Sequence, residues 1–362
     1  MTGGGRKRSG ALVALLAAVA VLAACSGGGS GSGSEGGGAA TTAPASSAEP
    51  TTTAATASTT AGEGDRPTRG VALSPRSYEE DDFLAFLERA PEAGGLLAHY
   101  ADWGELGDED SALSVTVELA RQRGMEPVVA VSPYDASQRR LFRPLDAETT
   151  ARYVEDAAAF AGRHRPPFFG IGVEINLLAD SSPADFDRFV ELFGEAAAAV
   201  HEASPDTRVF VVFQLEWMQG LRGGLFGGTD DPSKAQWDLL DRFPAADLVA
   251  FTTYPGLVHR TPADLPDGYY AEIREHTDVP VGFTEVGWAA EPPAEGWPGS
   301  EDDQAAFVER FLDLTAGLEP QLAIWTFLYP QPAAEAPFAT MSLLRDDGTP
   351  RPAWEAWARG AG

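Results

Sequence analysis

Two glutamates, each at the end of a short apolar run, are the residues of this sequence whose types could do chemistry together. Glu285 follows the run at 281–284, and Glu174 follows the run at 168–173. Two carboxyl groups about 5 to 5.5 Å apart can cleave a glycosidic bond with retention, because one attacks the anomeric carbon while the other protonates the leaving oxygen. This chemistry requires a fold that brings both carboxyl groups to one place.

Other side chains suited to a sugar also stand where apolar runs end. Tyr254 can donate a hydrogen bond that keeps Glu285 ionised, and the indoles of Trp288 and Trp325 offer flat apolar faces to a pyranose ring. Glu216 is a rival carboxylate, which we expect at the rim of the site. The remaining candidates for substrate binding are polar residues at the ends of their runs: Gln214, Asn176 and His99.

The elements that would position these residues alternate along residues 69–362. Runs of strand character occur at 69–73, 96–100, 127–131, 168–173, 208–214, 248–253, 281–284 and 322–327. Segments of helical character follow at 80–89, 111–123, 147–163, 183–203, 234–242, 267–275, 301–314 and 354–359. This alternation with short connections predicts an α/β fold, a single (β/α)8 TIM barrel whose strand ends carry the active site. An open nucleotide-binding sheet is disfavoured, since no glycine-rich turn follows the first run.

Five segments at these strand ends stand in a recognisable order. They are Gly-Ile-Gly-Val-Glu-Ile-Asn at 170–176, Thr-Tyr-Pro at 253–255, Thr-Glu-Val-Gly-Trp at 284–288, Trp325 and the closing segment 346–354. Together they resemble the clan of (β/α)8 retaining glycoside hydrolases, and their residues and order are most similar to those of the endo-β-1,4-galactanase (arabinogalactan-degrading) family. The resemblance implies that Glu174 is the acid/base, Glu285 the nucleophile, Tyr254 its hydrogen-bonding partner and Trp325 part of the sugar platform.

One position departs from the clan pattern. Members of the clan have Asn immediately before the acid/base, where its amide binds the substrate 2-hydroxyl, and this chain has Val173. Hydrogen bonds to that hydroxyl strengthen in the transition state and contribute on the order of several kcal/mol. Asn176 is an alternative donor. The sequence therefore leaves two further readings beside an active hydrolase: a non-catalytic carbohydrate-binding lipoprotein, and an envelope lipoprotein without a sugar ligand.

Residues 1–25 have the pattern of a bacterial lipoprotein signal peptide. Three basic residues precede an apolar run at 11–24, and Leu-Ala-Ala-Cys at 22–25 resembles a lipobox, which implies acylation of Cys25. An ordinary signal peptide or a short membrane anchor is the alternative. Residues 26–68 are almost wholly Gly, Ser, Ala, Thr and Pro and predict a disordered linker. We expect residues 69–362 to be anchored to the outer face of the cytoplasmic membrane, in the cell envelope.

Composition excludes several other classes. The formal net charge of −28 should repel nucleic acid and anionic lipids, so we expect membrane contact only through the lipid at Cys25. Cys25 is the only cysteine and the histidines show no paired spacing, so we expect neither a metal nor a cofactor. Ser74 lacks the Gly-x-Ser-x-Gly context of a serine hydrolase. We expect a monomer whose partner is a carbohydrate.

Overall fold

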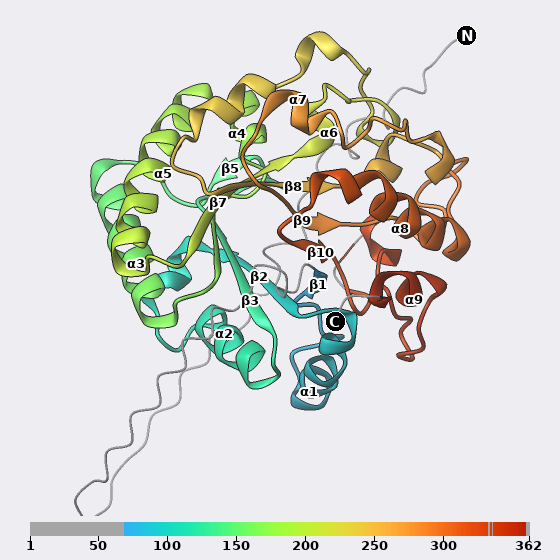
Figure 1. Ribbon diagram of the computed structural model, residues 1–362, viewed down its shortest axis with the longest axis horizontal. Helices are drawn as coiled ribbons and strands as arrows, with labels where there is room; N and C mark the ends of the chain where they lie inside the picture. The colour runs from blue at the N-terminus through green and yellow to red at the C-terminus, as the bar shows by residue number, and fades with distance from the viewer. Residues whose placement is uncertain (1–68, 332–333, 335, 360–362) are drawn as a thin grey trace, which may run out of the picture. The chain divides into compact units, whose positions relative to one another are not determined.

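A closed barrel of eight parallel strands forms the centre of the protein, with helices around it (Figure 1). The structure is a computed structural model and describes residues 69–331, 334 and 336–359. The predicted signal peptide, Cys25 and the linker 26–68 lie outside the described residues. The prediction of a (β/α)8 barrel is confirmed by this topology.

The barrel strands pair in the order β1-β10-β9-β8-β7-β6-β3-β2, and β2 closes the ring by pairing with β1. Their bounds are β1 Arg69–Ala72, β2 Leu96–Asp102, β3 Glu126–Ser132, β6 Phe168–Ile171, β7 Arg208–Gln214, β8 Leu248–Thr253, β9 Val281–Val286 and β10 Ala323–Trp325. Since all pairings in the ring are parallel, every strand ends at the same face of the barrel.

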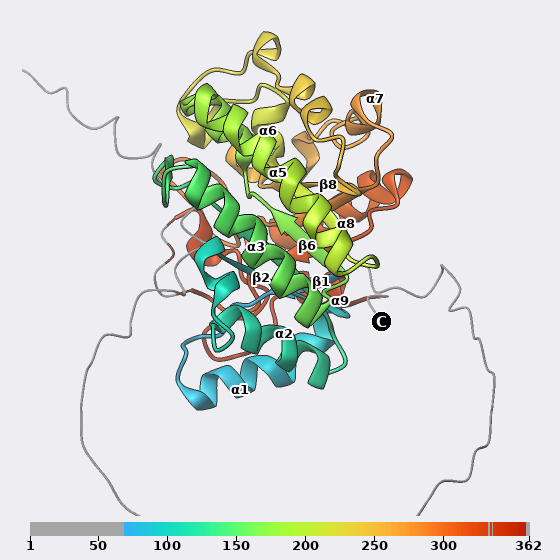
Figure 2. The same cartoon turned by 90° about the vertical axis from the view of Figure 1, so that its left-hand side faces the viewer.

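Helices cover the outside of the ring, as the side view in Figure 2 shows for α1, α2, α3 and α5. The main helices are α1 Glu80–Arg89, α2 Ala112–Gln122, α3 Ala147–His164, α5 Pro183–Ala203, α8 Glu301–Thr315 and α9 Pro352–Ala358. Polar caps set several helix starts: Asp146, Ser111 and Ser300 each accept a hydrogen bond from a backbone N–H in the first turn. Among the described helices, none is both long and apolar enough to cross a membrane.

Two of the expected helices are shorter or tighter than the pattern indicates. The segment expected at 234–242 forms the 3-10 turns Pro232–Lys234 and Trp237–Arg242, and the segment expected at 267–275 yields only the short helix α7, Ile273–His276. Gly268 and the two tyrosines that follow it have low helix propensity, which explains the late start of α7. A small hairpin, β4 Tyr134–Asp135 with β5 Arg140–Leu141, adds to the loop after β3.

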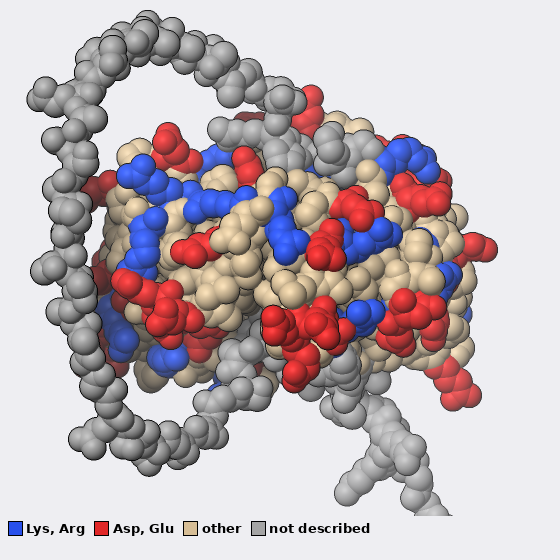
Figure 3. All heavy atoms as spheres, turned by 90° about the horizontal axis from the view of Figure 1, so that it is seen from below, with Lys and Arg blue, Asp and Glu red and all other residues tan. Residues whose placement is uncertain are grey.

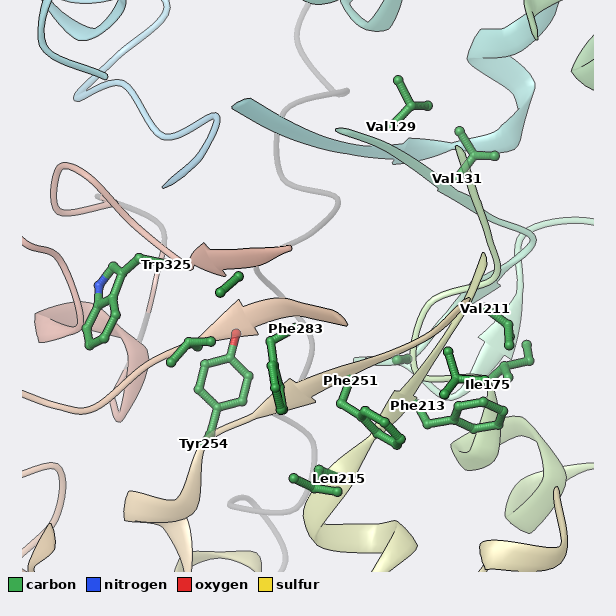
Figure 4. Packing of buried hydrophobic residues seen from close by; sticks show 14 of the residues in the cluster. Val129, Val131, Ile175, Val211, Phe213, Leu215, Phe251, Tyr254, Phe283 and Trp325 are labelled. Atoms are coloured by element: carbon green, nitrogen blue, oxygen red, sulfur yellow. The ribbon is translucent and has the colours of Figure 1, made fainter. Parts of the chain in front are cut away.

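Side chains along each strand alternate between the barrel interior and the layer beneath the helices. The interior cluster includes Leu96, Ala98, Val128, Ala130, Phe168, Phe210, Val212, Leu248, Ala250, Leu322 and Ile324. The outer layer contains the intervening residues, among them Val129, Val211, Phe213, Phe251 and Phe283, which Figure 4 shows projecting from their strands. This alternation decides which residue at each strand end faces the barrel axis.

A hydrogen-bonded seam joins the first strand to the last helix. The Arg69 guanidinium donates to the carbonyl oxygens of Trp357 and Arg359 at 2.7 and 2.6 Å. The indole N–H of Trp357 donates to the carbonyl oxygen of Gly70 at 3.2 Å. The closure of the barrel between β1 and β10 is thus supported by α9.

Acidic and basic side chains are interspersed on the face drawn in Figure 3. Ion pairs among the described residues include Arg345 with Glu301 at 2.5 Å and Arg76 with Asp82 at 3.0 Å. The negative net charge is therefore not gathered into one patch on this face.

Candidate active site

The backbone after β6 turns sharply to present Glu174. β6 ends at Ile171, Gly172 has a φ of 85°, and Glu174, the N-cap of α4, Ile175–Ser181, has a φ of 50°. A Cβ on Gly172 would lie 2.4 Å from Cζ of Phe189, so only glycine fits there. A non-glycine residue in the left-handed region is strained, and such strain persists where the surroundings fix one orientation.

One oxygen of the Glu174 carboxyl is held and the other is left without a partner. Oε1 accepts a hydrogen bond from the Thr252 hydroxyl at 2.7 Å. Oε2 is buried and has no hydrogen-bond partner among the described residues. Burial, followed by repulsion from Glu285, raises the pKa of Glu174 well above its ordinary value. The protonated form of Glu174 is therefore favoured, and it can offer a proton from an unpaired oxygen.

A β-bulge turns Glu285 toward the barrel axis. Phe251 of β8 is paired with Phe283 of β9, yet the next residue, Thr252, is paired with Glu285, so Thr284 is an extra residue in β9. Without this extra residue, alternation would place Glu285 on the same outer face as Val281 and Phe283. Bulges re-aim side chains in this way next to active sites.

The Glu285 carboxylate is held by Tyr254. The Tyr254 hydroxyl donates a short hydrogen bond to Oε2 of Glu285 and lies 3.1 Å from the Thr326 hydroxyl. Burial raises the pKa of Glu285 to about 7, while the hydrogen bond from Tyr254 opposes the rise by favouring the charged form. Tyr100, in the barrel interior, donates to the carbonyl oxygen of Thr284 and lies near enough for the Glu285 charge to raise the pKa of its hydroxyl further, beyond the larger effect of burial.

Glu174 and Glu285 therefore form an electrostatically coupled pair with different surroundings. The proton is favoured on Glu174, and the negative charge is favoured on Glu285, which has the hydrogen bond from Tyr254. A pair of carboxyl groups whose environments separate their protonation states can supply one acid and one base or nucleophile.

Val173 points into the barrel and is 6% exposed, within the apolar interior cluster. Its backbone N–H donates to the Ser132 hydroxyl at 3.4 Å. The position of Val173, where members of the clan have an amide, is thus apolar in this protein.

Asn176 and Gln214 form hydrogen bonds with each other, and Gln214 also bonds Glu216 and Trp217. The Asn176 side chain accepts from the Gln214 backbone N–H at 2.8 Å and donates to the Gln214 carbonyl oxygen at 3.1 Å. The Gln214 side chain accepts from the Trp217 backbone N–H and donates to Glu216. Both residues are buried and join β7 to α4 and to the short helix α6, Leu215–Met218. The structure shows them linking these elements, and their expected role in substrate binding stays a prediction.

The indoles of Trp325 and Trp288 offer no face to a ligand, contrary to the expectation of a sugar platform. Trp325 is fully buried, because alternation places its neighbour Ile324 in the interior and Trp325 in the outer layer. Its ring lies 5.3 Å from the Trp357 ring, and its N–H donates to the Met341 carbonyl oxygen. Trp288 is 3% exposed and stacks on Phe307 of α8.

His99 also faces away from the barrel axis. Leu97 and Ala101, two residues before and after it on β2, belong to the outer layer. Burial lowers the pKa of His99 to about 4, so the ring is neutral. The expectation that His99 faces the substrate is therefore wrong for this structure.

Glu216 is fully buried and accepts hydrogen bonds from four donors. The Tyr269 hydroxyl, the Thr253 hydroxyl and the Tyr254 backbone N–H lie at 3.0, 2.9 and 3.1 Å from Oε1, and the Gln214 amide bonds Oε2. Through these bonds Glu216 fixes the end of β8. The rim position expected for this carboxylate is corrected to a buried one.

Three residues around the two glutamates were not predicted from the sequence: Thr252, which bonds Glu174, Thr326, which lies against the Tyr254 hydroxyl, and Tyr100, which bonds the Thr284 carbonyl oxygen. Each faces the barrel interior by strand alternation, in step with Ala250, Ile324 and Ala98. The period-2 pattern of the strands is the signal that could have identified them.

Within the described residues, no group of three or more His, Cys, Asp or Glu side chains is arranged to hold a metal ion.

The fold is a (β/α)8 barrel, and solved structures of glycoside hydrolases with this fold resemble the protein. No protein-family model matches the sequence, and no curated protein matches it. The catalytic domain of a family 53 glycoside hydrolase from Ignisphaera aggregans has a TM-score of 0.57 at 15% identity, over 82% of this chain and 97% of that chain. Family 53 is the galactanase family that the sequence motifs resemble.

Two other neighbours have the same fold. A GH5_18 protein from Bifidobacterium longum subsp. longum, solved in complex with Manb1-4GlcNAc, has a TM-score of 0.59 at 15% identity, over 82% of this chain and 78% of that chain. A family 39 glycoside hydrolase from Bacteroides cellulosilyticus WH2 has a TM-score of 0.56 at 17% identity, over 81% of this chain. The chain spans 63% of the length of that family 39 protein. At these identities the likeness shows the fold.

Proposed function

We propose that the protein is a glycoside hydrolase that cleaves an oligo- or polysaccharide by a retaining double displacement. The observation that carries the proposal is the coupled pair Glu174 and Glu285 at the carboxyl end of the barrel, with the proton favoured on one and the charge on the other. The fold of known glycoside hydrolases supports it.

The chemistry follows from the two environments. The Glu285 carboxylate attacks the anomeric carbon, and Glu174 gives its proton to the leaving oxygen as the glycosidic bond breaks. Tyr254 holds Glu285 in its ionised form and in one orientation. Glu174, now ionised, then removes a proton from water, and the resulting attack releases the sugar from Glu285 and restores both residues.

The sequence motifs and the family 53 fold likeness make β-1,4-galactan the first substrate to test. We further propose that Cys25 carries a lipid that holds the protein to the outer face of the cytoplasmic membrane, as a monomer. Metabolic labelling with a clickable fatty acid tests the anchor. The wild-type chain should incorporate the label and sediment with membranes, and Cys25→Ala should do neither; equal labelling of both proteins contradicts the anchor.

Hydrolysis of galactan, other plant and microbial polysaccharides and aryl glycosides tests the reaction. Glu285→Gln should lower kcat by about 10³-fold or more, since it removes the nucleophile, and Glu92→Gln, an exposed residue of a surface ion pair, should leave it unchanged. Proton NMR of the first product should show retained anomeric configuration. Equal activity of wild type and Glu285→Gln would contradict the mechanism, and an inverted product would replace it with single displacement.

A second candidate is a carbohydrate-binding barrel without turnover, which Val173 favours. Its apolar side chain stands where the clan has an amide for the substrate 2-hydroxyl. In this case the wild type binds glycans without cleaving them, and Val173→Asn gains hydrolysis. Turnover by the wild type contradicts this candidate.

A further inference from the structure

Two arginines and a tryptophan form a group at the same end of the barrel as Glu174, which we call the Trp217 stack (Arg139, Trp217 and Arg222). The Arg139 guanidinium lies 4.6 Å from the centroid of the Trp217 ring, and that of Arg222 lies 3.8 Å from it. Arg139 stands in the β4–β5 hairpin after β3, and Trp217 lies on α6, directly after β7. Because both segments follow carboxyl ends of strands, the stack lies on the same end of the barrel as Glu174.

The stack contacts α4, the helix whose N-cap is Glu174. Nη1 of Arg139 lies 3.9 Å from a carboxylate oxygen of Asp180, and the Tyr134 hydroxyl lies 3.4 Å from that of Ser181. Both partners stand in the last turn of α4. The charge of Arg139 also acts on Glu174, lowering its pKa against the larger effect of burial.

The charges of Asp180 and Asp230 act on Arg222, but neither carboxylate forms a close ion pair with its guanidinium. The Arg222 guanidinium donates to the carbonyl oxygens of Trp217 and Leu221, and no carboxylate of the described chain lies within 4 Å of it. Partial burial lowers the pKa of Arg222 to about 10, which leaves it charged at neutral pH. The Arg139–Asp180 pair is long and exposed, with side chains 29% and 48% accessible, and such pairs contribute little.

The stack is also a fixed structure. Arg139 has a φ of 51°, and it shares the left-handed region with only three other non-glycine residues of the described chain, one of which is Glu174. Since guanidiniums lie over the indole and Trp217 is 8% exposed, the ring orients the arginines and does not present a free face to a sugar. Two oriented guanidiniums beside a proton donor are suited to an anion.

We propose that the substrate is an acidic glycan, whose carboxylate or sulfate group lies on the leaving-group side of the scissile bond and binds Arg139 and Arg222. This inference rests on the proposed function, since it assigns the leaving-group side from the role of Glu174 as acid/base. The planar fork of a guanidinium binds two oxygens of a carboxylate or sulfate through parallel N–H···O bonds.

Binding at the stack has a second consequence for Glu174. An anion on Arg139 offsets the positive charge that lowers the Glu174 pKa. Glu174 therefore keeps its proton to higher pH when the bound sugar is acidic, and the alkaline limb of activity moves upward for acidic compared with neutral substrates.

The test uses the purified full chain carrying Glu285→Gln, which prevents turnover, on a glycan array of matched members. Each uronic-acid oligosaccharide stands beside its carboxyl-reduced neutral form, and each sulfated oligosaccharide beside its desulfated form. Calorimetry of the best pair then gives Kd values. We expect the acidic member to bind at least about tenfold more tightly, the effect of one charge-assisted hydrogen-bonded contact.

Variants separate charge recognition from support of the fold. Arg139→Gln and Arg222→Gln, each added to Glu285→Gln, should abolish the preference for the acidic member and leave the neutral member's Kd within about twofold. Arg139→Lys should retain part of the preference, because it keeps the charge and loses the fork. The matched control is Arg89→Gln, which removes a guanidinium 4.6 Å from the Trp354 ring on the other end of the barrel and should change neither Kd.

Three outcomes overturn the inference. They are equal binding of acidic and neutral members, equal weakening of both members by Arg139→Gln, and an alkaline limb of wild-type activity that is the same for acidic and neutral substrates. If neutral glycans are still cleaved with retention in those cases, the proposed function stands and only the acidic substrate fails. If no glycan is bound or cleaved, both fail.

Discussion

Glu174 and Glu285 are the same residue type in the same barrel, and their neighbours give them different properties. Thr252 bonds one oxygen of Glu174 and leaves the other unpaired, whereas Tyr254 bonds Glu285 in its charged form. The sequence predicted that both glutamates stand at strand ends and that Tyr254 bonds Glu285, because strand ends can be recognised from apolar runs. It did not predict that Trp288 and Trp325 point outward, since this depends on strand register and on where a bulge falls.

The pH dependence of activity should reflect these environments. Since Glu285 must be ionised to attack and its pKa is about 7, kcat/KM should rise with pH up to about 7. Tyr254→Phe removes the hydrogen bond that favours the charged form, so this acid limb should move to higher pH by about one unit. The measurement is kcat/KM against pH on the best aryl glycoside. If the acid limb is unchanged in Tyr254→Phe, ionisation of Glu285 is not its cause.

Ionisation of Glu285, which should increase activity, should decrease the stability of the fold. The pKa of Glu285 is raised from 4.5 to about 7 by burial, so its contribution to stability is present below about pH 4.5 and is lost as the pH rises through 7. Glu285→Gln removes the buried charge and should raise the free energy of unfolding by on the order of 1 to 3 kcal/mol at pH 8, and by little at pH 4.5.

Urea unfolding at both pH values checks this prediction, with Glu92→Gln as the control for an exposed carboxylate. A gain of the same size at both pH values would show that ionisation of Glu285 is not its cause.

At the scale of elements, two irregular segments aim the glutamates: the turn at Gly172 after β6 and the bulge at Thr284 in β9. Most strands and the helices α1, α2, α3, α5 and α8 follow from alternation, amphipathic spacing and caps in the sequence. The bulge and the left-handed turn do not, because each depends on pairing with a strand or helix distant in the chain. The function of a strand end is thus harder to predict than the strand itself.

Gly172→Ala tests the turn. The added Cβ would meet Phe189 at 2.4 Å and the φ of 85° disfavours any side chain, so we expect a loss of about 2 to 4 kcal/mol in the free energy of unfolding and a lower kcat. Gly194→Ala on α5 is the matched control. It has open space around the added methyl and should stabilise the protein by about 0.5 to 1 kcal/mol.

Urea unfolding measures both changes. A Gly172→Ala protein as stable and as active as the wild type would show that the backbone at this turn does not determine the position of Glu174.

At the scale of the whole molecule, the barrel is closed by contacts between its two ends in sequence. Trp357 of α9 packs against Trp325 and Phe311 and bonds the Gly70 carbonyl oxygen, while Arg69 bonds back to α9. Sequence periodicity predicted a helix near the C-terminal end of the domain. Its contact with β1, at the other end of the sequence, follows only from the closed topology of the barrel.

Trp357→Ala should therefore destabilise the entire barrel by about 3 to 5 kcal/mol, because it empties a fully buried site and breaks the bond to Gly70. Tyr78→Ala, which removes a 54% exposed ring, should cost less than about 1 kcal/mol. Thermal and urea unfolding followed by circular dichroism measure both. A Trp357→Ala barrel as stable as Tyr78→Ala would show that α9 is not needed for closure.

The seam at Arg69 also affects how the barrel responds to force applied through the chain before this residue. β1 begins at Arg69, at the amino ends of the strands, whereas Glu174 and Glu285 lie at the carboxyl ends. A bead or a surface attached through the chain before Arg69 therefore joins the barrel at the end opposite the two glutamates. Force applied through that attachment acts first on the bonds from Arg69 to α9, so a pulling experiment should peel β1 from the barrel before it disturbs the strands that carry the two glutamates.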